Sequence, residues 1–97
     1  MKQLQITDHY KVVKVEFAAG HSMPRHVATS DAFLIVESGK ALLIFEKETV
    51  ELSKGVTQPI PANEQHMLKI IDDFKAYIVL ANEAKINFSK ADQKEVN

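Results

Sequence analysis

Apolar and polar residues alternate along most of this sequence with a period of two. In the segment 10–17, Val13, Val15 and Phe17 fall on one face, and the two residues between them are charged. Successive side chains of a β-strand point to opposite faces, so this pattern predicts a half-buried strand. Comparable segments predict further strands at 31–37, 40–46, 49–52, 66–71 and 74–80. Pro59 and Pro61 predict an extended segment at 57–61, because each proline fixes φ and disfavours a helical conformation of the residue before it.

The breaks between these segments fall at residues that favour turns. Ser38-Gly39 separates 31–37 from 40–46, and because glycine readily takes the positive φ of a tight turn, we expect a hairpin there. Asp72-Asp73 predicts a second hairpin, between 66–71 and 74–80, while Lys47-Glu48 and Ser53-Lys54-Gly55 predict simple turns. Short strands with such turns indicate an all-β barrel or sandwich, with at least about seven strands and no helix longer than about three turns.

Length and composition indicate one domain over residues 1–97, with a barrel core at about 10–80. Residues 81–97 are expected to form an edge segment and tail. Ile86 and Phe88 lie two residues apart, as one face of an edge strand requires, and the polar residues from Ser89 onward are expected to fray. A domain this small buries a modest share of its surface, so an oligomer would add stability.

Charge and cysteine content exclude several classes of function. The 12 basic and 13 acidic residues nearly cancel, which gives no electrostatic basis for binding nucleic acid or an anionic membrane. The chain has no cysteine, which excludes a disulfide framework, a thiolate metal site and a cysteine nucleophile. No apolar run approaches the roughly 20 residues of a membrane span, and the first residues lack the apolar stretch of a secretory signal. We therefore expect a cytoplasmic protein.

Two stretches together contain all three glycines and all three prolines. Gly20 is followed by His26 and Gly39, and Gly55 by Pro61 and His66. At these spacings the stretches resemble the two signature motifs of the cupin superfamily, which implies a single-domain jelly-roll β-barrel over most of the chain. In that family the first motif supplies two histidines and a glutamate to a metal, and the second supplies one histidine. The present sequence departs from the motifs at four positions, which hold Ala28, Ala32, Asn63 and Ile70 in place of histidine, glutamate, glycine and asparagine.

The resemblance implies that His26 and His66 point into the barrel from adjacent strands. They are then candidate ligands for a divalent metal such as zinc, nickel, iron or manganese, with roughly 3 to 4 Å between their nearest nitrogens. Since alanine replaces two of the usual ligands, water or substrate would complete the coordination. The alternative is that the histidines hydrogen-bond each other, water or a bound ligand. The remaining residues expected around this pocket are Met23, Ala28, Ala32, Leu34, Val36, Leu68 and Ile70.

Several other residues near these motifs are candidates for the site, and each has a simpler structural interpretation. Asp31 reaches the pocket only if a β-bulge shifts its strand, and is otherwise a turn residue. His21 and Met23 either provide further ligands or line the mouth of the barrel. Glu64 and Gln65 are expected in solvent before His66, and His9 on the surface.

No nucleophile elbow, phosphate-binding glycine loop or pair of catalytic carboxylates is present, so the sequence leaves open whether the protein is an enzyme. It favours binding of a small molecule in the barrel. A metal-dependent isomerase or oxygenase and a dimeric sensor or interaction module are the alternatives. A homodimer is expected because Phe33 and Ile35 in one strand, with Leu43 and Phe45 in the next, place apolar residues on both faces.

Overall fold

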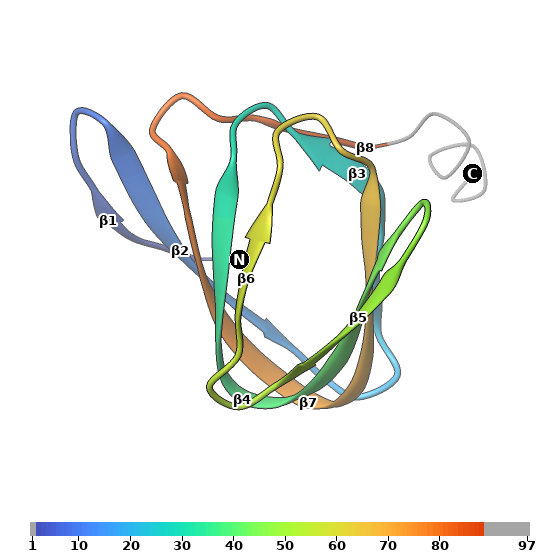
Figure 1. Ribbon diagram of the computed structural model, residues 1–97. Coiled ribbons are helices and arrows are strands. Elements are labelled where there is room, and N and C mark those ends of the chain that lie inside the picture. Colours follow the sequence, from blue (N-terminus) through green and yellow to red (C-terminus); the bar gives the residue numbers. More distant parts are fainter. Residues whose placement is uncertain (1, 89–97) are drawn as a thin grey trace, which may run out of the picture.

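Every regular element in residues 2–88, the part of the chain that the computed structural model describes, is a β-strand (Figure 1). The strands are β1 (Lys2–Ile6), β2 (Tyr10–Phe17), β3 (Ser22–Ala28), β4 (Ala32–Phe45), β5 (Thr49–Ser53), β6 (Thr57–Ile60), β7 (His66–Ala81) and β8 (Ile86–Phe88). Within these residues the prediction of at least seven strands without a long helix is confirmed. No helix in this part of the chain has the length and apolar character needed to cross a membrane.

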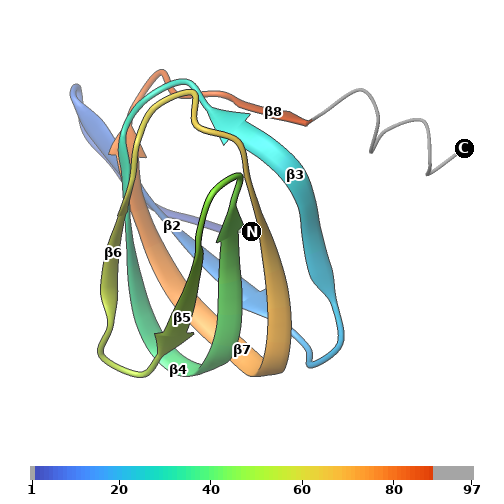
Figure 2. The same ribbon diagram turned by 45° about the vertical axis from the view of Figure 1, so that its right-hand side comes forward.

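Two long antiparallel strands, β4 and β7, build the barrel. They pair from Ala32 opposite Leu80 to Phe45 opposite His66, and both bend from one half of the barrel into the other (Figures 1 and 2). One half consists of β6, the first part of β4, the last part of β7, β2 and β1. The other consists of β5, the second part of β4, the first part of β7, β3 and β8. This arrangement is the all-β jelly roll that the sequence predicts.

The two predicted hairpins at Ser38-Gly39 and Asp72-Asp73 are wrong, because both sites lie inside continuous strands. Gly39 has a φ of 91° within β4, and the pairing of β4 with β7 shifts register on either side of it. A Cβ at Gly39 would overlap the carbonyl oxygen of Asp73 and lie 2.8 Å from Cα of Phe74. The glycine therefore permits a bulge and a close approach of the two backbones where both strands bend.

The core lies between the two halves of the barrel. Val15, Leu34, Leu43 and Phe74 are each at most 2% exposed, and the alternation in the sequence accounts for this, since these residues fall on inward-facing positions. Val13 and Phe17 are only partly buried and pack against the core. Phe33 and Ile35 face outward, whereas the predicted partner residues Leu43 and Phe45 are interior.

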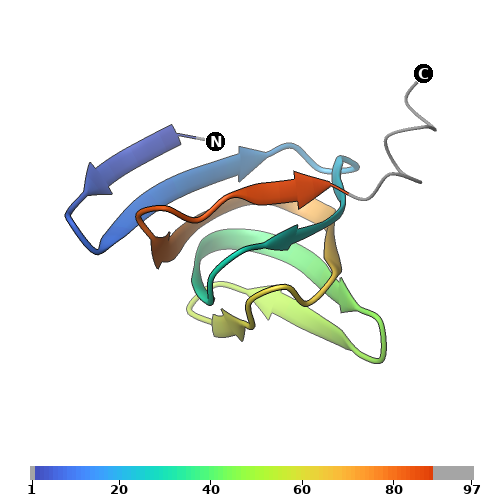
Figure 3. The ribbon, with the colours of Figure 1, turned by 90° about the horizontal axis from the view of Figure 1, so that it is seen from above.

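The two ends of the strand order are formed by β1 and β8. β8 pairs with β3, so the edge strand expected near Ile86 and Phe88 is present. The tail expected from Ser89 onward lies outside the described residues. β1, which the sequence pattern did not reveal, lies beside β2 at the opposite edge (Figure 3), and all five of its residues are exposed.

Candidate functional site

His26 and His66 lie side by side in the interior of the barrel. His26 is near the end of β3 and is directly paired with His66, the first residue of β7. Their ring centroids are 4.2 Å apart, with 64° between the ring planes. The two residues are only 6% and 5% exposed. The structure therefore brings together the two histidines that the motifs single out.

Each imidazole is fixed by a hydrogen bond to the backbone two residues earlier. Nδ1 of His26 lies 2.6 Å from the carbonyl oxygen of Pro24, and Nδ1 of His66 lies 2.8 Å from that of Glu64. A carbonyl oxygen only accepts hydrogen bonds, so each Nδ1 carries the proton and donates it. In a neutral ring Nε2 then keeps its lone pair, and within residues 2–88 neither Nε2 has a hydrogen-bond partner.

Local backbone irregularities make these hydrogen bonds possible. The pairing of β3 with β7 shifts register between Met23 and His26, around Pro24, which has no N–H to contribute to the ladder. The turn before His66 contains Asn63 with a φ of 63°. Asparagine tolerates this left-handed conformation better than most residues, which explains why it can occupy the glycine position of the motif. The amide of Asn63 donates to the carbonyl oxygen of Ala28 at 2.8 Å and so joins this turn to β3.

Burial is the largest influence on the ionisation of both rings, and it lowers the pKa of His26 and of His66 below the usual 6.5. The hydrogen bonds to Pro24 and Glu64 act in the opposite direction, because they favour the protonated rings. The proximity of His66 lowers the pKa of His26 further. At neutral pH the site therefore presents two neutral imidazoles.

Two phenylalanines extend the histidine pair into a row of four rings. Phe45 on β4 lies 6.0 Å from His66, and Phe88 on β8 lies 5.5 Å from His26, measured between ring centroids. The row follows the register, since Phe45 pairs with His66 and Phe88 with His26. Sequence reasoning missed both phenylalanines as neighbours of the site, because only strand pairing places them there.

The other expected pocket residues lie inside the barrel but differ in role. Ala28, two residues after His26, and Ala32, the first residue of β4, are both 6% exposed. Ala32 belongs to the core cluster, as do Leu34, Val36, Leu68 and Ile70, and Met23 packs against that cluster. The inward orientation inferred from alternation is observed for the leucine, valine and isoleucine residues of this set, which are 2–4% exposed.

A hollow of about 460 Å³ borders His66 at the ends of β4 and β7. Its lining consists of Arg25, Ile44, Phe45, Glu46, Gln65, His66 and Met67. Arg25, the single arginine of the chain, forms no ion pair with another residue of the described part. The sequence motifs did not indicate this hollow, since Arg25 and Glu46 fall outside the motif positions. It lies at the rim of the barrel beside His66, and the outward-facing Ile44 and Met67 form part of its wall.

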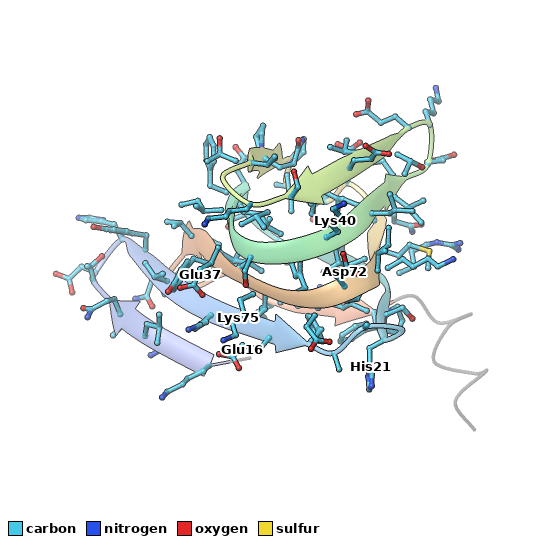
Figure 4. All side chains as sticks on the ribbon, turned by 90° about the horizontal axis from the view of Figure 1, so that it is seen from below. Glu16, His21, Glu37, Lys40, Asp72 and Lys75 are labelled. Carbon is cyan, nitrogen blue, oxygen red and sulfur yellow. The ribbon has the colours of Figure 1, made fainter. Side chains whose placement is uncertain are left out.

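The described residues contain no group of three or more His, Cys, Asp or Glu side chains that could hold a metal ion. Asp31 accepts a hydrogen bond from the amide of Ala62 at 2.8 Å and so joins two loops, as a turn residue would. His21 lies before β3, at the opposite end of that strand from His26, and points outward (Figure 4). His9, Glu64 and Gln65 are exposed. In the described residues the site thus consists of two imidazoles, and their Nδ1–H groups are held by carbonyl oxygens as those of metal-bound histidines usually are.

Comparisons with known proteins agree with this architecture. A family model described as a cupin domain matches residues 13–81. Among solved structures, a cupin superfamily protein from Desulfitobacterium hafniense DCB-2 is 20% identical, with a TM-score of 0.76 over 81% of this chain and 72% of that one. A conserved protein of unknown function from Streptococcus pyogenes is 24% identical, with a TM-score of 0.74 over 81% of this chain and 69% of that one.

An enzyme is also among the similar structures. The DMSP lyase DddQ from Ruegeria pomeroyi DSS-3 is 20% identical, with a TM-score of 0.79 over 86% of this chain. The aligned part is only 44% of the lyase. At these identities the solved structures show the fold alone, and no curated protein sequence matches the chain.

Proposed function

This chain belongs to the cupin domain family, and we propose that it binds a small, neutral molecule beside His26 and His66. The observation that carries the proposal is the pair of buried imidazoles, whose Nδ1–H groups are used by backbone carbonyls while both Nε2 lone pairs lack a partner in residues 2–88. Unpaired acceptors in a buried site are costly, so a ligand that donates hydrogen bonds to them gains affinity.

The surroundings of the pair suggest the chemistry of this ligand. Two neutral imidazoles accept hydrogen bonds, so a hydroxyl or N–H group suits them better than a carboxylate, which brings acceptors of its own. Phe45 and Phe88 flank the pair, and aromatic side chains pack well against flat rings. A hollow borders His66 at the rim of the barrel, next to this pair. A planar ring that carries a hydroxyl or N–H donor fits these features.

Side-chain ¹⁵N NMR spectra of the imidazoles test this proposal. Phenol, anisole and benzoate serve as probes, since they share a ring and differ in carrying a donor, no donor or a negative charge. We expect phenol to shift the Nε2 resonances of His26 and His66 in a saturable manner, and anisole and benzoate to have much weaker effects. Equal responses to all three probes, or no response to phenol, would reject the proposed ligand chemistry.

A matched pair of variants separates the site from the protein surface. His26→Phe/His66→Phe keeps ring-shaped side chains but removes both acceptors, and is expected to abolish saturable phenol binding, read from backbone amide shifts. His9→Phe/His21→Phe removes the two exposed imidazoles and is expected to leave binding unchanged.

A metal-dependent enzyme of the isomerase or oxygenase type is the second candidate, favoured by the Nδ1–H···O=C hydrogen bonds of both histidines. A divalent metal at Nε2 of His26 and His66 would act as a Lewis acid on a substrate bound beside it. Elemental analysis for zinc, nickel, iron and manganese distinguishes the candidates. The enzyme predicts a stoichiometric metal that is lost in His26→Phe/His66→Phe and retained in His9→Phe/His21→Phe, whereas simple ligand binding predicts none.

A third candidate is a dimeric sensor, in which ligand occupancy alters self-association without turnover. Its distinguishing measurement is the dimer dissociation constant with and without a saturating probe such as phenol. A sensor requires the two values to differ, because a ligand shifts an equilibrium only through differential affinity.

A further inference from the structure

The hollow of about 460 Å³ at the rim of the barrel is lined by side chains of opposite charge. Arg25 belongs to β3, and Glu46 directly follows β4. β7 pairs with both strands and so runs between them (Figure 2). Since neighbouring strands lie about 4.8 Å apart, the backbones at Arg25 and Glu46 are separated by roughly 10 Å. A guanidinium and a carboxylate therefore border one space from two sides.

The polar side chains of this hollow have no partner within the described part of the chain. In residues 2–88, Arg25 and Glu46 form no side-chain hydrogen bond or ion pair, with each other or with another residue. The side-chain amide of Gln65, which lines the same hollow, likewise has no hydrogen-bond partner there. These three groups are therefore available to a molecule that enters the hollow.

The wall between the polar groups is apolar. Ile44 and Met67 are directly paired on β4 and β7, and both are half-buried and line the hollow together with Phe45. The volume falls in the usual range of small-molecule sites, roughly 300–1,000 Å³, in which a few polar groups orient a ligand against apolar walls. A short apolar chain fits between the two charges.

A second hollow, of about 340 Å³, continues the first beyond Glu46. The two share Phe45, Glu46 and Gln65. The second hollow also contains Glu48, Glu64 and Lys47, so its carboxylates outnumber its single ammonium group. We call the two hollows together the Arg25 groove. The groove is positive at the Arg25 end and negative at the other.

We propose that the Arg25 groove binds a small zwitterion whose carboxylate and ammonium groups are joined by an apolar chain. The planar guanidinium of Arg25 can donate two parallel hydrogen bonds to a carboxylate. The ammonium group of the same molecule lies among the carboxylates at the other end, and its chain lies on Ile44 and Met67. A ligand of one charge leaves half of these contacts unused. This inference does not depend on the ligand proposed for the buried histidines.

The hollow that contains Lys40 and Glu51, of about 310 Å³, fits such a ligand less well. Lys40 lies directly opposite Asp72 in the register of β4 and β7, so a carboxylate of the protein is already close to it. A lysine ammonium is also a compact, strongly hydrated charge without the two-pronged geometry of a guanidinium.

Three probes of equal chain length test the proposal by NMR titration of the full chain at neutral pH. 6-Aminohexanoate carries both charges, hexanoate only the negative one and hexylamine only the positive one. We expect 6-aminohexanoate to shift the Arg25 Nε–H, Gln65 amide and Met67 methyl signals in a saturable manner. Its dissociation constant should be at least about threefold lower than those of the other two, as one additional exposed ion pair allows. Equal constants for the three probes, or no saturable response to 6-aminohexanoate, overturn the proposal.

Neutral variants locate the binding site. Arg25→Gln and Glu46→Gln are each expected to weaken 6-aminohexanoate binding at least about threefold, because each removes one of the two charge contacts. Lys69→Gln/Glu51→Gln is the matched control, since Lys69 and Glu51 are exposed, opposite in charge and each directly paired with Leu42. The control should bind 6-aminohexanoate as the native protein does. An equal loss in the control, or no loss in Arg25→Gln, overturns the assignment to the Arg25 groove.

Discussion

The charge state of the two buried histidines follows from their immediate surroundings. Burial disfavours the charged rings, and each Nδ1 proton is directed to a carbonyl oxygen only two residues away. The spacing is local, so the orientation of each ring is set by its own turn or bulge. The pair can therefore present two lone pairs without any carboxylate to orient them.

Acidification is expected to destabilise the protein through this pair. The pKa values of His26 and His66 are lowered in the folded state, so as the pH falls through the usual 6.5 the unfolded chain binds protons that the folded chain does not. The free energy of unfolding then decreases, and its decrease levels off below the folded-state pKa values. Urea denaturation between about pH 8 and about pH 5 measures the effect.

The control for this prediction removes the titrating groups but keeps their hydrogen bonds. In His26→Asn/His66→Asn the amide N–H can still donate to the carbonyl oxygens of Pro24 and Glu64, so the pH dependence is expected to be shallower than in the native protein. His9→Asn/His21→Asn, which removes the exposed imidazoles, is expected to leave the loss between pH 8 and pH 5 in place. The same slope in all three proteins would exclude the buried pair as its source.

Restoring donors at the two alanine positions is expected to create a metal site. Ala28→His/Ala32→Glu adds an imidazole and a carboxylate at buried positions of the barrel. Zinc affinity measured by calorimetry should rise at least tenfold, which requires only about 1.4 kcal/mol from the two added ligands. Combining these changes with His26→Phe/His66→Phe should remove the gain. No increase in affinity would show that the four positions do not converge.

At the scale of strands, the pairing of β4 with β7 shows which features of the fold the sequence predicts and which it does not. Alternation located β2, β4, β5 and β7, because burial on one face of a strand leaves a period of two in the sequence, but it did not reveal β1 or β3. It did not show that β4 continues through Gly39, since a glycine with positive φ serves a turn and a bulge equally well. The motif spacings identified His26 and His66, whereas Phe45 and Phe88 join them only through register, which no local pattern records.

Gly39→Ala is expected to be strongly destabilising. Alanine at a φ of 91° costs about 1–2 kcal/mol, and the overlap of its Cβ with the backbone of Asp73 adds about 1–3 kcal/mol. Gly55→Ala provides the comparison, because Gly55 has a φ of 86° and no atom within 4 Å of an added Cβ. Denaturant titrations should therefore show a larger loss for Gly39→Ala. Equal decreases in the free energy of unfolding would mean that β4 and β7 can move apart at Gly39 without loss of stability.

At the scale of the whole molecule, small size and an open apolar face act together. One barrel of this length buries a limited share of its surface, while Phe33 and Ile35 remain substantially exposed. Association through Phe33 and Ile35 in the expected homodimer would therefore add to the stability of each copy, in the way that any ligand specific to the folded state does.

The melting temperature is consequently expected to depend on protein concentration. Raising the concentration tenfold should raise the midpoint of the native protein and of Ile71→Glu, and leave that of Phe33→Glu nearly constant. Scanning calorimetry at two concentrations measures this. A midpoint independent of concentration in the native protein would argue against any coupling of folding to dimer formation.

The position of β7 late in the chain also has a consequence during protein synthesis. β7 pairs with β2, β3 and β4, whereas without it the earlier strands form only the pairs β1–β2, β4–β5 and β4–β6. Of these strands, β4, β5 and β6 form one sheet and β1 and β2 another, and β7 is the strand that joins the two. A nascent chain therefore cannot close the barrel until residue 81 has left the ribosome. Translation that stops before that point releases unprotected, alternating segments that are prone to aggregate.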